Sequence, residues 1–202
     1  MRVLFYCLKF AFPLFFAFFC SCTTIPTLKV TYEMTSKSNV LEGKEIFFKF
    51  VDQRTDKDII GDTARGLYEG YSGNISFILS GQGSEEYLVG IYDVEELFRE
   101  TFALYLENNG LQLSDEAKPG IPQLTIWLEK FILDLDGRKW LAVISYEAEF
   151  VKNGRTIVRK FKGEGQKFRI SGLNQAHAVV SEVFTDIVNQ LDIQSMFADD
   201  VK

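Results

Sequence analysis

The feature that most constrains the fold is a succession of three long runs in which apolar and polar residues alternate, at 124–134, 139–151 and 156–163. Alternation with a period of two is typical of half-buried β-strands. Asp136-Gly137 separates the first two runs and Asn153-Gly154 the last two. Both dipeptides favour tight hairpins, because type I′ turns require positive φ at both central residues. The sequence therefore predicts three consecutive antiparallel strands.

The second of these turns also predicts a register. With Asn153-Gly154 as a two-residue loop, residues of the two strands oppose one another in pairs, which lie alternately on the solvent face and on the apolar face of the sheet. The predicted pairs are Val151 with Thr156, Glu147 with Lys160, and Tyr146 with Phe161. Arg159 then lies opposite Ala148 on the apolar face. That placement requires either a bulge that shifts the register or an arginine side chain that reaches the edge of the sheet.

Two helices are predicted, at 93–109 and 174–196. The first begins at a capping box formed by Asp93 and Glu96, whose side chains meet free amides of the first turn, and it ends before Gly110. The second carries one long apolar stripe, a pattern that packs a helix on a sheet. The stripe consists of Ala176, Val179, Val180, Val183, Phe184, Ile187, Val188 and Leu191.

Two further strands are predicted before the first helix, at 28–34 and 46–51. The first alternates apolar and polar residues, whereas the second is apolar on both faces, which is typical of a central strand. Together these elements predict an α+β fold with a mostly antiparallel sheet and two main helices packed on one face. The alternative is a β-rich sandwich with peripheral helices.

The first 22 residues have the properties of an export signal. Arg2 and Lys9 supply the positive charge of an n-region, and the almost unbroken apolar run 10–19 suits an h-region. The apolar block is borderline in length for a transmembrane helix and is interrupted by Lys9 and Pro13. We therefore expect residues 1–21 to be a signal peptide that is removed.

The end of this run, Phe19-Cys20-Ser21-Cys22, resembles the lipobox of bacterial lipoproteins, with Cys22 as the acylated residue. It departs from the usual pattern at Phe19, where an aliphatic residue is commoner, and Cys20 is a weaker candidate for the acylated residue. An ordinary cleaved signal peptide or an uncleaved membrane anchor would also fit this stretch. The resemblance implies two or three acyl chains, palmitate among them, which anchor a protein stably. The residue after Cys22 is not aspartate, and by the sorting rule of Gram-negative lipoproteins this implies the periplasmic face of the outer membrane.

Acylation of Cys22 divides the chain into a signal peptide (1–21), a short tether (22–27) and a single domain (28–202). Removal of the signal leaves 181 residues, takes away Arg2 and Lys9 but no acid, and changes the net charge from −6 to −8. An acidic protein of this kind is not expected to bind nucleic acid through phosphates or to lie flat on anionic lipid. The expected partners are the membrane, through the acyl chains, and an envelope protein or an apolar ligand.

Few residues of the mature domain are suited to catalysis or metal binding. Cys7 and Cys20 leave with the signal and Cys22 becomes a thioether, so no thiol is left for catalysis, disulfides or zinc. His177 is the one histidine of the chain and has no second histidine beside it as a metal ligand or proton relay. We interpret Asp52 and Arg54 as a pair that fixes the end of a strand. The prediction is therefore no catalytic residue, no metal and no cofactor.

A glycine- and tyrosine-rich segment, about 61–92, separates the early strands from the first helix. It holds seven of the chain's 15 glycines, and 75–79 and 87–92 have the composition of short strands. We predict that it is the contact surface for a protein partner or an apolar ligand, because tyrosine is enriched at interfaces and long irregular loops are usually functional. The candidate residues are Tyr68, Tyr71, Phe77, Tyr87 and Tyr92. The competing interpretation is an extra strand that merely extends the sheet.

The order of parts resembles a known family. A lipobox and early strands are followed by Asp52-x-Arg54, a later Ile60-Gly61, one helix, three successive strands and a final helix. This order resembles the YajG-like and ABC-transport auxiliary lipoproteins and, more loosely, the lipopolysaccharide-assembly lipoprotein LptE. The resemblance covers about 22–195, with about 64–90 as an insertion. It implies a small periplasmic α+β domain without catalytic residues, and some members are partners of envelope transport machinery.

Two classes of function remain open at the level of the sequence. The first is a membrane-anchored, non-catalytic binding or accessory module of the cell envelope, for example in lipid or envelope transport or assembly. The second is a carboxylate-dependent envelope hydrolase, such as a glycosidase, which needs two carboxyl groups facing each other about 5–10 Å apart across a cleft.

Overall fold

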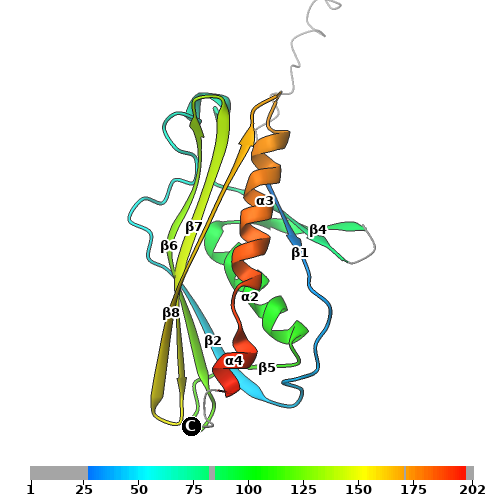
Figure 1. The fold of residues 1–202 in the computed structure, drawn as a ribbon, viewed down its shortest axis with the longest axis vertical. Coiled ribbons are helices and arrows are strands. Elements are labelled where there is room, and N and C mark those ends of the chain that lie inside the picture. Colours follow the sequence, from blue (N-terminus) through cyan, green and yellow to red (C-terminus); the bar gives the residue numbers. More distant parts are fainter. Residues whose placement is uncertain (1–26, 82–84, 171, 199–202) are drawn as a thin grey trace, which may run out of the picture.

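The computed structural model describes residues 27–81, 85–170 and 172–198. The lipobox and the rest of the predicted signal peptide lie outside these residues. In the described part the strands are β1 (Leu28–Glu33), β2 (Glu45–Asp52), β3 (Ile75–Ser80), β4 (Glu86–Tyr92), β5 (Gln112–Ser114), β6 (Gln123–Asp136), β7 (Lys139–Lys152) and β8 (Arg155–Phe168). The helices are the 3₁₀ turn η2 (Arg65–Leu67), α2 (Val94–Asn108), α3 (Asn174–Asn189) and α4 (Ile193–Ala198). The chain has an α+β fold, as predicted (Figure 1).

The long strands β6, β7 and β8 form the meander that the alternating runs predicted. They are the larger part of a five-stranded sheet with the order β5-β2-β6-β7-β8. The register of β7 and β8 is the predicted one: Val151 pairs with Thr156, Glu147 with Lys160, Tyr146 with Phe161, and Ala148 with Arg159. This register runs without a bulge, and the Arg159 guanidinium donates a hydrogen bond to Ser195 Oγ in α4 (2.8 Å).

The two turns of the meander differ from each other. Asn153 and Gly154 have φ of 51° and 76°, as a type I′ turn requires. At the other turn Asp136 pairs with Lys139, so the two central residues are Gly137 and Arg138. Of these, only Gly137 has a positive φ (58°). The sequence predicted the hairpin correctly, but its loop lies one residue later than the Asp-Gly dipeptide.

The predicted antiparallel pairing is confirmed for most of the paired residues, but both sheets are mixed rather than purely antiparallel. β2 pairs in parallel with both β5 and β6. The connection from β2 to β6 runs through the second sheet and α2, which returns the chain to the same end of the sheet before β6 begins. Strands joined by such a crossover run parallel, whereas strands joined by a tight turn are antiparallel. The central position predicted for 46–51 is confirmed.

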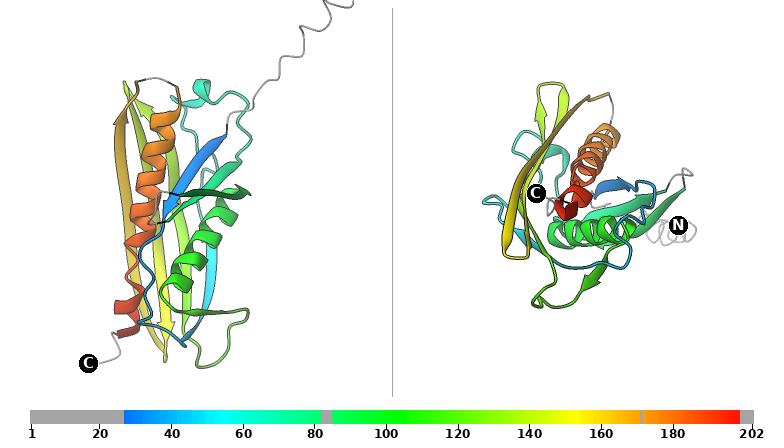
Figure 2. Two further views of the ribbon diagram at one scale, coloured as in Figure 1. Left: turned by 90° about the vertical axis from the view of Figure 1, so that its right-hand side faces the viewer. Right: turned by 60° about the horizontal axis from the view of Figure 1, so that its bottom comes forward.

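The glycine-rich segment contributes β3 and β4 to a separate three-stranded sheet with the order β1-β3-β4. β3 is its central strand, parallel to β1 and antiparallel to β4. The segment is therefore neither a structureless loop nor an extension of the large sheet. Figures 1 and 2 show that the β3–β4 hairpin projects away from the body of the molecule.

Helices α2 and α3 lie on one face of the large sheet, as predicted, and β1 runs along α3 (Figure 2). The core between these elements is rich in aromatic rings. Phe98 of α2 lies at its centre, with ring centroids 5.0 Å from Phe184, 5.5 Å from Phe50 and 5.5 Å from Phe131. Such edge-on and offset contacts add to the stabilisation that burial of the rings provides.

The second predicted helix is divided in two. α3 ends at Asn189, and α4 begins after Asp192, whose carboxylate accepts from the Ser195 amide (3.0 Å) as an N-cap. The Leu191 carbonyl between the helices accepts a hydrogen bond from the buried Tyr105 hydroxyl. The apolar stripe is buried throughout, including Leu191. None of the helices in the described part of the chain combines the length and apolarity that a membrane span requires.

Candidate functional site

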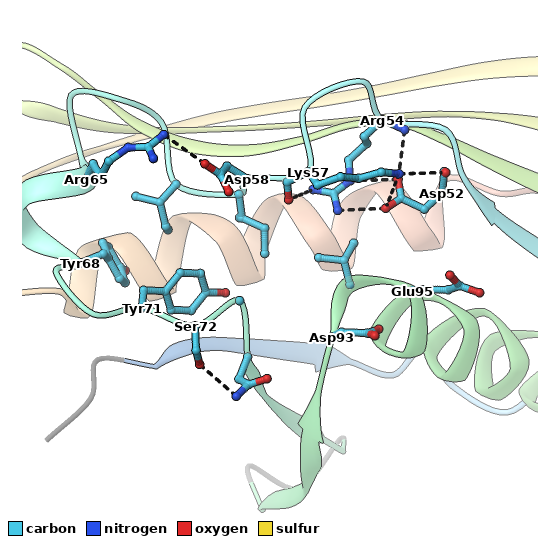
Figure 3. Close-up of a pocket in the computed structure, with 15 residues that line it drawn as sticks. Asp52, Arg54, Lys57, Asp58, Arg65, Tyr68, Tyr71, Ser72, Asp93 and Glu95 are labelled. Carbon is cyan, nitrogen blue, oxygen red and sulfur yellow. Dashed lines mark hydrogen bonds and ion pairs between the residues drawn. The ribbon is translucent and has the colours of Figure 1, made fainter.

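A cleft of about 530 Å³ opens beside the end of β2, where the chain leaves the large sheet and approaches the second one. It is lined by the loop 52–60, by the turn around η2, by 71–74 and by the start of α2. The side chains that face it are largely polar (Figure 3). They are Asp52, Arg54, Lys57, Asp58, Arg65, Tyr68, Tyr71, Ser72, Asp93 and Glu95.

The Asp52–Arg54 pair holds together the loop that follows β2, on one side of this cleft. The guanidinium donates from Nε to one carboxylate oxygen and from Nη2 to the other, both at 3.0 Å. Arg54 also donates to the Lys57 carbonyl (3.2 Å), and Lys57 Nζ lies 3.1 Å from the Asp52 carboxylate. The Arg54 side chain is 4% exposed and that of Asp52 12%. This geometry confirms that the pair fixes the end of a strand.

Electrostatics at Asp52 follow from this arrangement. Burial on its own raises the pKa of the carboxyl group, but hydrogen bonds from Arg54 and Lys57 outweigh it, and the pKa lies below its ordinary value. Asp52 is therefore held as a carboxylate. A carboxylate of this kind, occupied by two cations, is poorly suited to act as a general acid.

The Ile60-Gly61 part of the motif attaches the same loop to β6. Leu133 donates to the Ile59 carbonyl (2.7 Å), and Gly61 donates to the Leu133 carbonyl (2.9 Å). A Cβ atom on Gly61 would lie 2.3 Å from Asp134 Cγ, so this position needs glycine for steric reasons. The Asp134 carboxylate in turn accepts from the Ala64 amide (3.0 Å). The D-x-R and I-G residues thus have a shared structural role, which is to hold one side of the cleft.

Two tyrosines form the opposite wall. Tyr68 is buried against Trp140, with ring centroids 6.1 Å apart, and Tyr71 contacts Tyr68 edge-on at 5.8 Å. Burial raises the pKa of both phenols well above its ordinary value. Neither hydroxyl has a hydrogen-bond partner within the described residues. The two phenols are therefore the polar groups of the cleft that a ligand or water can still satisfy.

Two of the other three acids of the cleft also have structural partners among the described residues, the exception being Glu95. Asp58 pairs with Arg65 (3.1 Å), and Asp93 accepts from the Glu96 amide (2.8 Å) as the N-cap of α2. The predicted start of that helix is thereby confirmed. Among residues 27–81, 85–170 and 172–198, no cluster of three or more histidine, cysteine or acidic side chains is placed to hold a metal ion.

The five aromatic candidates do not lie on one surface. Phe77 and Tyr68 are buried in the core, while Tyr71 and Tyr92 are partly buried. Tyr87 is exposed and donates its hydroxyl to Glu85. Burial rules out Phe77 as a contact residue, because it packs on β1 and Tyr92 in the small sheet. The segment contributes partly to the core and partly to the surface.

The exposed large apolar residues of the segment lie in β4, which the number of tyrosines did not reveal. Its exposed apolar residues are Tyr87 (58%), Leu88 (66%), Val89 (41%) and Ile91 (61%). Leu88 pairs with Ile78 of β3, and Ile91 with Ser76, so Leu88 and Ile91 point to the same side of the hairpin. Between them the register shifts, which leaves Val89 as the extra residue of a bulge. The sequence signal that could have indicated this exposed surface is the run without polar residues in β4, Leu88 to Ile91.

His177 lies outside the cleft, in the first turns of α3. Its ring is hydrogen-bonded to the backbone of Thr27, and burial, with a contribution from Lys29, lowers its pKa below the ordinary value. It is accordingly neutral at pH 7 and joins α3 to the beginning of β1.

Comparisons with known proteins find likeness in the fold. No family model matches the chain, and no curated protein matches it. Protein XCC0632 from Xanthomonas campestris, of family DUF330, is similar in structure, with 13% identity, a TM-score of 0.50, and coverage of 85% of this chain and 99% of that one. Protein CT253 from Chlamydia trachomatis has 8% identity and a TM-score of 0.45, with coverage of 76% and 95%. Lipoprotein GNA1162 from Neisseria meningitidis has 15% identity and a TM-score of 0.29, with coverage of 73% and 99%.

Of these, the likeness to XCC0632 shows that the α+β fold described here is shared with another bacterial protein. At this identity it says nothing of function. The predicted resemblance to the YajG-like, ABC-transport auxiliary and LptE lipoproteins stays a prediction.

Proposed function

We propose that this chain is a lipid-anchored, periplasmic accessory protein of the bacterial envelope, which binds a protein partner along the edge of β4. The anchor is Cys22, at the periplasmic face of the outer membrane. The observation that carries the proposal is the exposed apolar edge strand β4. The lipobox supports its place in the envelope.

The four edge strands of the two sheets differ in how they are protected against pairing with another chain, and β4 is the least protected of them. The edge of β1 is covered by α3: Thr31 N donates to Ser181 Oγ (2.9 Å), and Glu33 N donates to Thr185 Oγ1 (3.1 Å). β5 is three residues long. Short edges and covered edges are common protections against pairing with another chain.

The edge strand β8 is protected by charge. It carries five lysines and arginines along its length: Arg155, Arg159, Lys160, Lys162 and Lys167. Lysine on an edge strand opposes strand addition. β4 instead presents Leu88, Val89 and Ile91, with one charged residue, Glu86, at its start. Its free edge pairs with no other strand in the described part of the chain.

An edge of this composition favours addition of a strand from another protein. Main-chain hydrogen bonds would provide affinity, and alternate side chains such as Leu88 and Ile91 would provide specificity. The bulge at Val89 limits the length of regular pairing and so disfavours unlimited assembly. The hydrolase alternative has less support, since three of the four acids that line the cleft, Asp52, Asp58 and Asp93, have structural partners.

A photo-crosslinking residue at Leu88 in the full-length chain, expressed in its own cell, tests the proposal. Val158 is a matched control, because it is an exposed aliphatic residue (50%) on the other long edge strand. We expect a discrete crosslinked protein product from position 88, none from position 158, and loss of the product when Ile91→Lys is added. Ile91→Lys should change the free energy of unfolding by less than about 0.5 kcal/mol, as is usual at exposed sites.

Equal crosslinking from both positions would contradict the proposal. A product that consists of two copies of this chain would also contradict it, in favour of self-association through β4.

A further inference from the structure

One end of the domain brings together segments that are far apart in the sequence. The β6–β7 turn, the end of β8 and the starts of α3 and β1 all lie at the upper end of the molecule (Figures 1 and 2). Arg169 N donates to the Arg138 carbonyl (2.9 Å), which attaches the residue after β8 to that turn. The His177 ring holds the Thr27 backbone at the same end. The chain that leads back to Cys22 therefore leaves the fold here.

This end is apolar at its outermost points. Phe168 is 66% exposed and Ile170 is 81% exposed, the highest value among the large apolar residues described. Lys139 Nζ lies 5.2 Å from the centre of the Phe168 ring. An aromatic ring with a cation beside it is a combination suited to the interface between lipid head groups and acyl chains.

The charge next to Phe168 and Ile170 is opposite to that of the whole chain. Arg138, Lys139 and Arg169 lie around Phe168 and Ile170, and none of them is ion-paired with a described acid. Lys167 is paired with Glu182 (2.7 Å) and so adds little. Asp136, the last residue of β6, is the acid nearest to them in sequence. The side chains next to Phe168 and Ile170 are therefore mainly positive in a chain whose net charge is −6, whereas the turn around η2 at the same end carries the exposed acids Asp62 and Glu69.

The tether is short compared with the domain. From Cys22 to Leu28 there are six Cα-to-Cα steps, which span at most about 20 Å. The strands β6, β7 and β8 are each 14 residues long, so the opposite end at Asn153-Gly154 is about 45 Å away. Lipid on Cys22 therefore keeps the end with Phe168 and Ile170 close to the membrane.

From these observations we infer that Phe168 and Ile170 insert into the head-group region of the membrane that holds the acyl chains, with Arg138, Lys139 and Arg169 contacting anionic lipid. This inference rests on the acylation of Cys22 proposed above. It orients the domain upright, with the Asn153-Gly154 turn farthest from the membrane. β4, on the side of the body, stays accessible to a protein partner.

Fluorescence quenching in vesicles tests the orientation. The acylated mature protein, with Ile170→Cys or Val158→Cys, is labelled with an environment-sensitive fluorophore and reconstituted in vesicles of phosphatidylethanolamine and phosphatidylglycerol that contain a doxyl-labelled lipid. Cys22 is blocked by its own acylation, so the label reacts at the introduced cysteine. Val158 is the matched control, because it is exposed and ten residues before Phe168 on the same strand, about 33 Å away. Emission of the buried Trp140 reports that both variants are folded.

We expect the probe at 170 to lose most of its fluorescence and the probe at 158 to keep it. Adding Arg138→Glu and Arg169→Glu, or replacing the anionic lipid with phosphatidylcholine, should reduce the quenching at 170. Equal quenching at both positions would show a domain that lies flat and would overturn the inference. A protein that floats with the vesicles but is quenched at neither position would overturn it while leaving the anchor intact. A protein that does not float would contradict the anchor itself.

Discussion

Replacement of Arg54 by methionine should destabilise the domain far more than the same replacement of Arg65, although both arginines line one cleft. Methionine keeps the apolar volume of the arginine stem but leaves the Asp52 carboxylate, 12% exposed, without its bidentate partner. Removal of one partner of a buried ion pair costs about 3–5 kcal/mol. Lys57 still lies 3.1 Å from Asp52 in the variant, so we expect the lower end of that range, about 3 kcal/mol.

Arg65→Met is the matched control. The Arg65 side chain is 58% exposed and its partners Asp58 and Asp62 are 61% and 97% exposed. Exposed pairs of this kind contribute at most about 1 kcal/mol. Urea unfolding, followed by the emission of the buried Trp140, measures both variants, and a change in midpoint at constant slope reports stability.

The pH dependence provides a second readout of the same prediction. The pKa of Asp52 is lowered in the folded state, so its contribution is present at pH above its ordinary value and is lost as the pH falls through the folded value. Without Arg54, burial raises the pKa of Asp52, and protonation of this carboxyl group then removes the buried unpaired charge that destabilises the variant. The difference between Arg54→Met and the unaltered chain should therefore shrink below about pH 4. Equal, small losses for Arg54→Met and Arg65→Met at pH 7 would refute the reasoning.

Three further predictions follow from the packing. Gly165→Ala places a Cβ 2.6 Å from Val183 Cγ2 and should lower the free energy of unfolding in urea by about 1–3 kcal/mol. Gly66→Ala is the control, because a Cβ there meets open space and should leave the stability unchanged. Equal effects of the two substitutions would contradict the close packing of α3 on β8. Asp93→Ala removes the N-cap of α2 and should cost about 1 kcal/mol, which Asp93→Asn restores in part; an unchanged midpoint would contradict the capping role. The lowered pKa of His177 means that the unfolded chain takes up the proton first, so stability should fall as the pH drops below about 6.5, and His177→Gln should flatten this slope; an unchanged slope would contradict it.

Local features of the sequence predicted most of the elements and part of their pairing. The Asn153-Gly154 turn, together with the alternation on both sides, predicted four cross-strand pairs between β7 and β8, and the structure has all four of them. Register follows from turn geometry once the loop length is known. Asp93 predicted the beginning of α2 because a cap acts on neighbouring amides. The glycines at 163 and 165, unexplained in the sequence, allow α3 to approach β8.

Features that depend on distant parts of the chain were not predictable in this way. The parallel pairing of β2 with β6 depends on the path of about 70 intervening residues, which no local pattern encodes. Tyr68 and Phe77 are residue types that are common at interfaces, but both are buried. Trp140, 72 residues after Tyr68, packs on Tyr68, and β1, at least 44 residues before Phe77, packs on Phe77. The cleft likewise needs the loop after β2 to meet the start of α2. Which tyrosines are exposed follows from the fold as a whole.

Mass spectrometry of the mature protein, purified from membranes, tests whether this chain is held in the envelope by a lipid anchor on Cys22. We expect an N-terminal peptide that begins at Cys22 and carries the mass of two or three acyl chains, and we expect Cys22→Ser to abolish both the modification and the partition into detergent. An unmodified N-terminus at another residue, or an intact chain that retains residues 1–21 and partitions unchanged after Cys22→Ser, would contradict this anchor.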